Sequence, residues 1–250
     1  MCAFSKVVLG FALLVFGACQ FEETQLFEPD MQLGETGSGD TSNNEEPCVP
    51  TVALQDDFQA GGPSVNWNKF TANDSTEGIV DGVLTLTPGI NKREYSGVGY
   101  QSTNDVFSLE EHRVHVEVKK MVNHDPVVHA GMRLRGPNEG RYNIEHNDGR
   151  IRFRYKSPNG EIEIFVEEPY DEANSKIWQF RVTDDTFFVD IGPDHDNMRV
   201  FGSDPLDSDE KKQTIQQAVL VLVAESRGPV EVPGSIHFDN LNLGGPECEP

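Results

Sequence analysis

The stretch VVHAGMRLRGPNEGRYNIEHNDGRIRFRYKSPNGEIEIFVEE, residues 127–168, decides the fold of this chain. Four short runs alternate apolar and polar residues with a period of two, and each break between them carries glycine with asparagine, aspartate or proline. This pattern predicts an antiparallel meander with tight turns. Alternation then assigns one set of side chains to the core face: Ala130, Met132, Leu134, Tyr142, Ile144, Ile151, Phe153, Tyr155, Ile162, Ile164 and Val166.

The opposite face of the predicted meander is polar and carries six arginines. A turn at residues 157–160 sets the cations of residues 150–156 across from Glu161, Glu163 and Glu167, which predicts a cross-strand ladder of opposite charges. A second interpretation is a ligand site, because arginine forks suit planar carboxylate or sulfate groups. The candidate ligand-binding residues on this face are Arg133, Arg135, Asn143, Arg152 and Arg154.

Composition and charge limit the class of protein. The chain has 250 residues, of which 36% are hydrophobic, and this is enough for one sizeable β domain. The formal net charge of −22 argues against nucleic acid as a partner, because phosphates need a basic protein surface. It also disfavours attachment to anionic lipid by charge alone.

The first eighteen residues have the pattern of an export signal. Lys6 precedes a ten-residue apolar run, residues 7–16, and two small residues follow it. The run is too short to span a bilayer as a helix. The four residues that end at Cys19 resemble the bacterial lipobox, which implies a lipidated Cys19 and, because Gln20 is not aspartate, anchoring at the outer membrane or cell surface of a Gram-negative bacterium. A plain signal peptide is the alternative.

Residues 19–50 differ in composition from the rest of the chain. Between residues 20 and 50 there are eight acidic residues and no lysine or arginine. Such a segment buries too little apolar surface to offset the entropy of ordering, so we expect a disordered acidic tether before a domain of residues 51–250.

The cysteines beyond the tether form an even pair. Cys48 and Cys248 flank the predicted domain, and in an exported chain such a pair predicts a disulfide. Free thiols or intermolecular bridges are the alternatives. No Cys-x-x-Cys spacing is present, so a thiolate zinc site is not supported.

The remainder of residues 51–250 reads as short strands separated by turns. Some twelve to fourteen strand-like runs recur at intervals of eight to twelve residues, and only residues 206–219 favour a helical turn. The prediction is an all-β domain of two packed antiparallel sheets.

Several motifs share an order and spacing with a known superfamily. They are Asp56-Asp57-Phe58 followed by Trp67, Asp81-Gly-Val-Leu-Thr-Leu86, Gly97-Val-Gly-Tyr100, Ala130-Gly-Met-Arg-Leu-Arg135, Trp178-Gln-Phe-Arg-Val182 and Phe238-Asp-Asn-Leu241. Over about residues 51–245 the chain resembles the concanavalin A-like lectin/glucanase superfamily. The resemblance implies a jelly-roll sandwich with one concave and one convex sheet, and the polar side of the meander on the concave sheet. It also implies a candidate structural Ca²⁺ site, for which Asp57 and Asp239 are the visible ligands.

The resemblance raises the question of catalysis. In laminarinase-type members, two glutamates on one strand act as nucleophile and acid/base, with an acidic residue between them. Glu161 and Glu163 invite the comparison, but Phe165 and Val166 stand where the second catalytic carboxylate is expected. Asp194-His195-Asp196 is interpreted as a turn rather than a metal site.

The sequence therefore predicts a non-enzymatic, lectin-like surface lipoprotein that binds a glycan, an acidic one included, and that does not hydrolyse β-glucans. The alternatives are a glycoside hydrolase or related sugar-active enzyme, and a structural envelope protein without a small ligand. Aromatic residues on the concave face would favour sugar binding.

Overall fold

The computed structural model describes residues 50, 51, 54–59, 67–90, 95–102, 108–110, 112–122 and 125–243. The predicted signal peptide, nearly all of the predicted tether, the lipidation site Cys19 and the predicted Cys48–Cys248 disulfide lie outside these residues. The residues that are described form two antiparallel sheets of seven strands each, so the all-β sandwich is confirmed.

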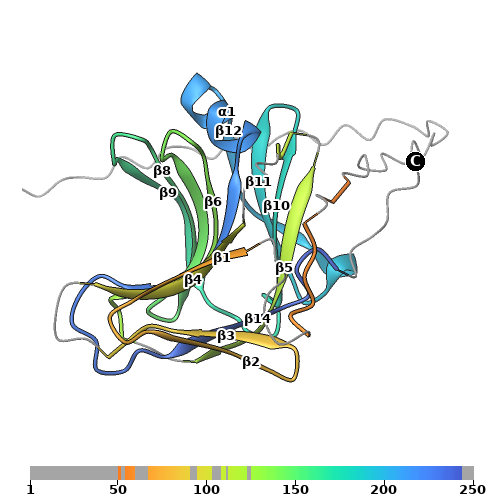
Figure 1. Ribbon diagram of the computed structural model, residues 1–250. Coiled ribbons are helices and arrows are strands. Elements are labelled where there is room, and N and C mark those ends of the chain that lie inside the picture. Colours follow the sequence, from red (N-terminus) through yellow and green to blue (C-terminus); the bar gives the residue numbers. More distant parts are fainter. Residues whose placement is uncertain are drawn as a thin grey trace, which may run out of the picture. The chain divides into compact units, whose positions relative to one another are not determined.

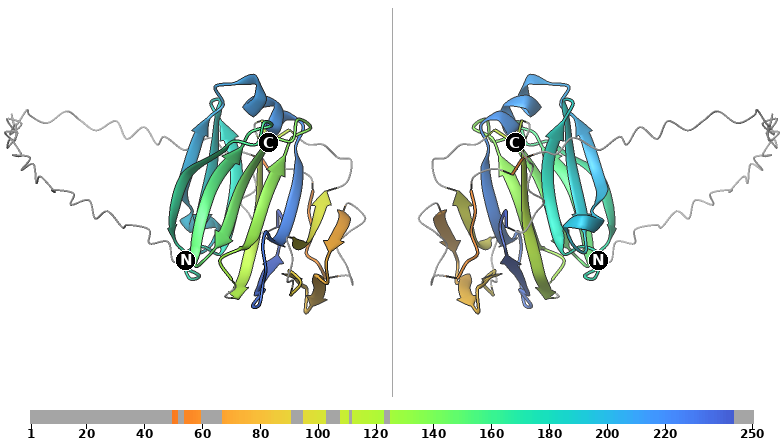
Figure 2. Two further views of the ribbon diagram at one scale, coloured as in Figure 1. Left: turned by 90° about the vertical axis from the view of Figure 1, so that its left-hand side faces the viewer. Right: turned by 90° about the vertical axis from the view of Figure 1, so that its right-hand side faces the viewer.

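The first sheet has the strand order β1-β4-β13-β6-β7-β8-β9. Its strands are β1 (Trp67–Ala72), β4 (Ser96–Ser102), β6 (Val128–Arg135), β7 (Arg141–Asn147), β8 (Arg150–Lys156), β9 (Ile162–Pro169) and β13 (Val219–Ser226). The left panel of Figure 2 looks onto its outer face, from the green β8 and β9 through the blue β13 to the yellow and orange β4 and β1. The sheet curves, and this outer face is its concave side (Figure 1).

The second sheet has the strand order β12-β11-β10-β5-β14-β3-β2. Its strands are β2 (Thr76–Val80), β3 (Val83–Thr87), β5 (Arg113–Val122), β10 (Ile177–Thr183), β11 (Thr186–Gly192), β12 (Arg199–Pro205) and β14 (Ser235–Asp239). It packs against the inner face of the first sheet, on the right in Figure 1, and the two inner faces enclose one core that includes Met132, Tyr142, Phe153, Trp178 and Phe187.

Two hairpin turns follow from their sequences. Asp81 and Gly82 join β2 to β3 with φ angles of 52° and 78°, and Asp148 and Gly149 join β7 to β8 with φ angles of 51° and 69°. Two successive positive φ angles are typical of a type I′ turn, whose twist matches that of the strands. Aspartate followed by glycine tolerates this conformation, so the chain reverses at these two points.

The predicted core face of the meander is correct for its first eight residues and wrong for two residues of the last strand. Ala130 through Tyr155 of the predicted set are at most 4% exposed, whereas Ile162 and Ile164 are 51% and 53% exposed. A register shift explains the difference: Phe153 pairs with Val166 and Arg154 pairs with Ile164, which leaves Phe165 as the extra residue of a β-bulge. Beyond the bulge every side chain of β9 changes face, and Phe165 packs against Phe153 with ring centroids 4.8 Å apart.

Helical structure is limited. The helix α1 (Asp209–Gln216) begins after Ser208, whose hydroxyl accepts a hydrogen bond from the Lys211 backbone N–H. It lies within the segment for which a helical turn is predicted. Short η1 (His195–Asn197) follows Asp194, which caps it through its carboxylate. Within the part of the chain that the structure describes, no helix has the length and apolarity needed to cross a membrane.

Candidate functional site

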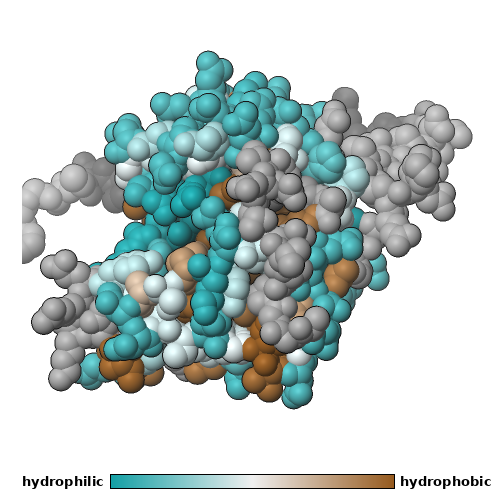
Figure 3. Space-filling view, viewed as in Figure 1, coloured by the Kyte–Doolittle hydropathy of each residue, from teal (hydrophilic) through white to brown (hydrophobic). Residues whose placement is uncertain are grey.

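A groove crosses the concave face of the first sheet. It has a volume of about 520 Å³ and takes its lining from β1, β4, β13, β6, β7 and β8 together with residues that flank them. Two aromatic residues and one acid line it, Phe70, Tyr95 and Glu225, and so do five cations, Arg133, Arg135, Arg141, Lys156 and Arg227. Figure 3 shows strongly hydrophilic residues in the hollow beside β6 and β4.

Two glycines of β4 make room for the aromatic residues. A Cβ on Gly99 would lie 2.6 Å from the ring of Phe70, and a Cβ on Gly97 would lie 2.7 Å from the hydroxyl oxygen of Tyr95 and 3.3 Å from the Cβ of Glu225. Glycine inside a strand often marks such a close approach. The aromatic side chains therefore lie directly over the strand, and the Tyr95 hydroxyl and Glu225 converge above Gly97.

Glu225 is an ionised carboxylate held by two arginines. It projects from β13 opposite Gly97 and His129, and its Oε1 accepts hydrogen bonds from Arg133 Nη2 at 3.0 Å and Arg227 Nη2 at 2.9 Å. Burial raises its pKa, but the charges of Arg133 and Arg227 outweigh burial and lower the pKa to about 2. The carboxylate is therefore negative at neutral pH.

Tyr95 is the proton-bearing neighbour of Glu225. Burial, and then the negative charge of Glu225, raise the pKa of the phenol above its usual value near 10, although nearby arginines act in the opposite direction. The residue keeps 40% of its surface exposed, so a ligand in the groove can reach it. Tyr95 thus presents a protonated hydroxyl to the groove at neutral pH.

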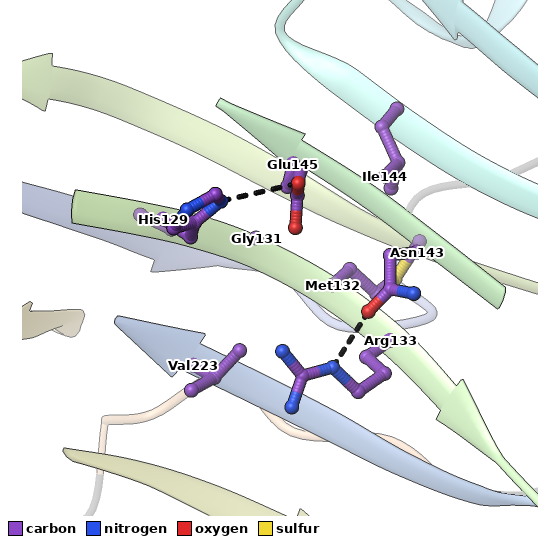
Figure 4. Close-up of a pocket in the computed structure, with 9 residues that line it drawn as sticks. His129, Gly131, Met132, Arg133, Asn143, Ile144, Glu145 and Val223 are labelled. Carbon is purple, nitrogen blue, oxygen red and sulfur yellow. Dashed lines mark hydrogen bonds and ion pairs between the residues drawn. The ribbon is translucent and has the colours of Figure 1, made fainter. Parts of the chain in front are cut away.

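A second carboxylate, Glu145 of β7, lies on the same face of the sheet, near Arg133 and Asn143 (Figure 4). It is 3% exposed, and the small space around it, between His129, Arg133 and Asn143, has no room for a water molecule. His129 Nδ1 donates to Oε1 at 3.2 Å and Arg154 Nη2 donates to Oε2 at 2.7 Å. Burial raises the pKa of Glu145, and the His129 hydrogen bond with the Arg154 charge lowers it to about 2. Glu145 therefore holds neighbouring side chains in place rather than facing a ligand.

The five predicted ligand-binding residues share the concave face but have different surroundings. Arg133 and Arg135 line the groove. Asn143 and Arg154 are 1% and 5% exposed, and Asn143 Oδ1 accepts a hydrogen bond from Arg133 Nε at 2.7 Å. Arg152 pairs with Glu167 and donates to Asn147 Oδ1 at 2.7 Å. Arg133 and Arg154 are thus buried among the partners that neutralise them, and ligand binding by the five residues stays a prediction.

The predicted charge ladder forms only in part. Arg150 and Arg152 both pair with Glu167, as expected. Arg154 instead pairs with Glu145, and Glu161 and Glu163 are exposed. The bulge at Phe165 is the cause, since it places Ile164 and Ile162 opposite Arg154 and Lys156.

The two candidate calcium ligands each have other contacts. Asp57 is exposed and accepts a hydrogen bond from the Gln59 backbone N–H, while Asp239 lies 3.4 Å from the ammonium of Lys119. A Ca²⁺ at Asp239 would have to displace that ammonium. Among the residues that the structure describes, no three or more His, Cys, Asp or Glu side chains are grouped to hold a metal. Calcium binding stays a prediction.

Sequence reasoning missed Phe70, Tyr95 and Glu225. They come from three distant segments, so no local spacing joins them. Two signals were present: the glycines of Gly97-Val-Gly99 inside a strand, and Glu225 as the one acid at the end of the apolar run of β13.

No protein-family model and no curated protein sequence matches this chain. Solved structures do match. One is SCLam, a non-specific endo-β-1,3(4)-glucanase from family GH16, with 12% identity, a TM-score of 0.59, and coverage of 78% of this chain and 91% of that one. A β-1,3-glucanase from Mycobacterium marinum has 12% identity, a TM-score of 0.58 and coverage of 76% and 97%. A glycosyl hydrolase family protein from Mycobacterium fortuitum has 15% identity, a TM-score of 0.57 and coverage of 76% and 97%.

These similarities overturn the non-enzymatic expectation. The matching structures are glycoside hydrolases, so the sugar-active alternative is better supported than a non-catalytic lectin-like protein. The expectation rested on residues 161–167, which end the turn before the edge strand β9 and form its first part, and none of these residues lines the groove. The lack of a second catalytic carboxylate in residues 161–167 therefore does not argue against catalysis in the groove. The described domain has the same two-sheet jelly-roll fold, concanavalin A-like, as these structures.

Proposed function

We propose that this chain is a carbohydrate-active enzyme that cleaves glycosidic bonds of a polysaccharide lying in the concave groove. The observation that carries the proposal is the convergence of Glu225 and the Tyr95 hydroxyl above Gly97, inside a groove of about 520 Å³ with an aromatic wall. That volume falls within the ~300–1,000 Å³ usual for ligand pockets. Glycoside hydrolases with the same fold support the choice of a sugar chain as substrate.

The two residues have complementary protonation states. Cleavage of a glycosidic bond passes through a transition state with positive charge on the sugar ring, and a proton must reach the leaving oxygen. Glu225, with a pKa of about 2, is suited to stabilise that positive charge. Burial and the charge of Glu225 raise the pKa of Tyr95, so the phenol is protonated at neutral pH and can give its proton to the leaving oxygen as the glycosidic bond breaks. Water then adds its oxygen to the positively charged ring carbon and returns a proton to the Tyr95 oxygen.

Arg133 and Arg227 position Glu225. Both donate to the same oxygen, Oε1, so that among the described residues Oε2 has no hydrogen-bond donor and is available to the sugar. Arg133 is itself fixed by its hydrogen bond to Asn143. A carboxylate whose orientation is set before substrate arrives needs little reorganisation during the reaction.

The test is release of reducing ends from a panel of polysaccharides by the full chain and by variants. The panel contains laminarin, lichenan, polygalacturonate and carrageenan. For any polymer that is cleaved, Tyr95→Phe and Glu225→Gln are expected to lower kcat by about 10²-fold or more.

Glu163→Gln is the control, because Glu163 is an exposed acid of β9 outside the groove lining. Thermal unfolding of each variant separates loss of catalysis from loss of folding, and Tyr95→Phe removes only a hydroxyl group. Equal rates in all four proteins would contradict the site. No cleavage of any of the four polymers would contradict the proposed function.

A further inference from the structure

Three cations form a row across adjacent strands at one end of the groove. Arg135 of β6 lies opposite Arg141 of β7, and Arg141 lies opposite Lys156 of β8. We call these three residues the cationic row. Directly opposed side chains have Cβ atoms about 4.5–5.5 Å apart, and like charges placed this way destabilise a sheet. The fold therefore holds an electrostatically unfavourable arrangement at a place open to the groove.

No acid of the described residues neutralises the cationic row. None of its three side chains has an ion pair or a hydrogen-bond partner in that part of the chain, whereas Arg133 and Arg227 share Glu225. The Nε of Arg141 is buried without a partner. A buried donor without an acceptor destabilises the fold, so a ligand that accepts a hydrogen bond from the Arg141 guanidinium would offset that cost.

The pKa shifts of Arg141 and Lys156 agree with this geometry. The charge of Arg141 is the largest cause that lowers the pKa of Lys156. Burial is the largest cause that lowers the pKa of Arg141, and the charge of Arg133 adds to that effect while the charge of Glu225 opposes it. The shift of Lys156 reports a positive potential in this part of the groove, on a chain whose net charge is −22.

The row is separated from the residues proposed to react. Arg135 pairs with Val219 on β13, whereas Glu225 lies opposite His129, six residues away along β6. The same groove touches both places. A polymer that reached Glu225 and Tyr95 at one end would therefore present another of its sugar units to the row.

We propose that the cationic row binds the carboxylate or sulfate groups of an anionic polysaccharide in the groove. This inference rests on the proposed function, since it names the substrate class of the same groove. Guanidinium groups bind both kinds of anion through paired N–H donors. The net negative charge elsewhere is screened beyond about 8–10 Å at moderate salt, so the row attracts the polymer only once it is close.

The experiment measures binding by calorimetry at 150 mM NaCl with three oligosaccharides of equal length. They are a neutral β-glucan oligomer, an oligogalacturonate and a sulfated carrageenan oligomer. The proteins are the full chain, the variant Arg141→Gln/Lys156→Gln, and the control variant Arg150→Gln/Lys212→Gln. The control removes the same charge outside the groove lining.

At least one anionic oligomer is expected to bind the full chain more tightly than the neutral one. The row variant should weaken that binding about tenfold or more, as expected for loss of charge-assisted hydrogen bonds, and the control variant less than twofold. Binding of the oligogalacturonate alone identifies carboxylate as the ligand group, and binding of the carrageenan oligomer alone identifies sulfate.

The unfolding temperature shows whether the cationic row binds a ligand or only stabilises the fold. Because the three cations repel one another, the row variant should unfold at a higher temperature than the unmodified chain when no sugar is present. Tighter binding of the neutral oligomer than of both anionic ones, or equal weakening by row and control variants, would overturn the inference. If either of these outcomes is found and the chain still cleaves a neutral glucan, the inference about the cationic row is wrong but the proposed function is not contradicted.

Discussion

Glu145 shows how a buried charge can organise a polar sheet face. Its two oxygens receive His129 from β6 and Arg154 from β8, so one carboxylate ties three adjacent strands together. Arg133 and Asn143 make a neighbouring link between β6 and β7. The bond to Asn143 holds Arg133, which in turn donates to Glu225.

We expect Glu145→Gln to lower the free energy of unfolding by about 3–5 kcal/mol at pH 7, because the change leaves Arg154 buried without its counter-charge. Urea unfolding measures the loss. Exposed Glu163→Gln is the matched control, with an expected change within about 0.5 kcal/mol.

The same pair of proteins should differ in their response to acid. The pKa of Glu145 is about 2 in the folded chain and near 4.5 ordinarily, so its contribution to stability is present above about pH 5 and is lost as the pH falls towards 2. Glu145→Gln has no such group, so its urea midpoint should fall less steeply between pH 5 and 2. Identical slopes for variant and unmodified chain would show that Glu145 does not carry this dependence.

At the scale of elements, period-two alternation with Asp-Gly turns was enough to predict the meander. It places Tyr142, Ile144, Ile151 and Phe153 in the core correctly because β6, β7 and β8 pair without interruption. Alternation fails at β9, because the extra residue Phe165 exchanges the core-facing and solvent-facing positions of the strand. Alternation counts positions along a single strand, whereas a bulge is a property of two paired strands, so the sequence of β9 alone does not reveal it.

The bulge changes which residues of β9 should matter for stability, compared with the period-two alternation. Phe165, which alternation assigns to solvent, contacts Phe153, so Phe165→Ala should lower the free energy of unfolding by about 1–3 kcal/mol. Ile164→Thr, at a site that is 53% exposed, should change it by less than about 0.5 kcal/mol. Thermal or urea unfolding compares them, and a larger loss for Ile164→Thr would mean that β9 pairs in the uninterrupted register.

At the scale of the whole molecule, the candidate site could not be read from local sequence. Phe70, Tyr95 and Glu225 meet because β4 pairs with both β1 and β13, a sheet order that no neighbouring residues specify. The arginines of the meander were visible because they share one continuous stretch. Their ion pairs were not, since the partner of Arg133 lies 92 residues away on β13.

The two ends of the described domain meet at one strand, which bears on the predicted Cys48–Cys248 disulfide. The Pro50 carbonyl accepts a hydrogen bond from Arg113 N–H at 2.9 Å, and Asn242 Oδ1 accepts one from His115 N–H at 2.8 Å. Both partners belong to the start of β5. The chain thus brings positions two residues after Cys48 and six residues before Cys248 to neighbouring sites.

We expect mass spectrometry of the unreduced, digested chain to show the Cys48 and Cys248 peptides joined. Closing a loop of about 200 residues contributes up to about 5 kcal/mol in the chain-entropy description, so reduction should lower the unfolding temperature. Alkylation of both cysteines without prior reduction would exclude the bridge. The control is Cys48→Ser/Cys248→Ser, whose unfolding temperature should not respond to reductant.

The bulge in β9 has a consequence for how copies of this chain meet one another. β9 ends the first sheet, and an edge strand with free backbone groups is a template on which a second molecule can add a strand. Exposed Ile162 and Ile164 would favour such stacking if the strand were flat. The bulge bends β9, and the negative charges of Glu161 and Glu163 lie at its start. Pro169, its last residue, has no backbone N–H to donate. For these reasons β9 resists edge-to-edge aggregation.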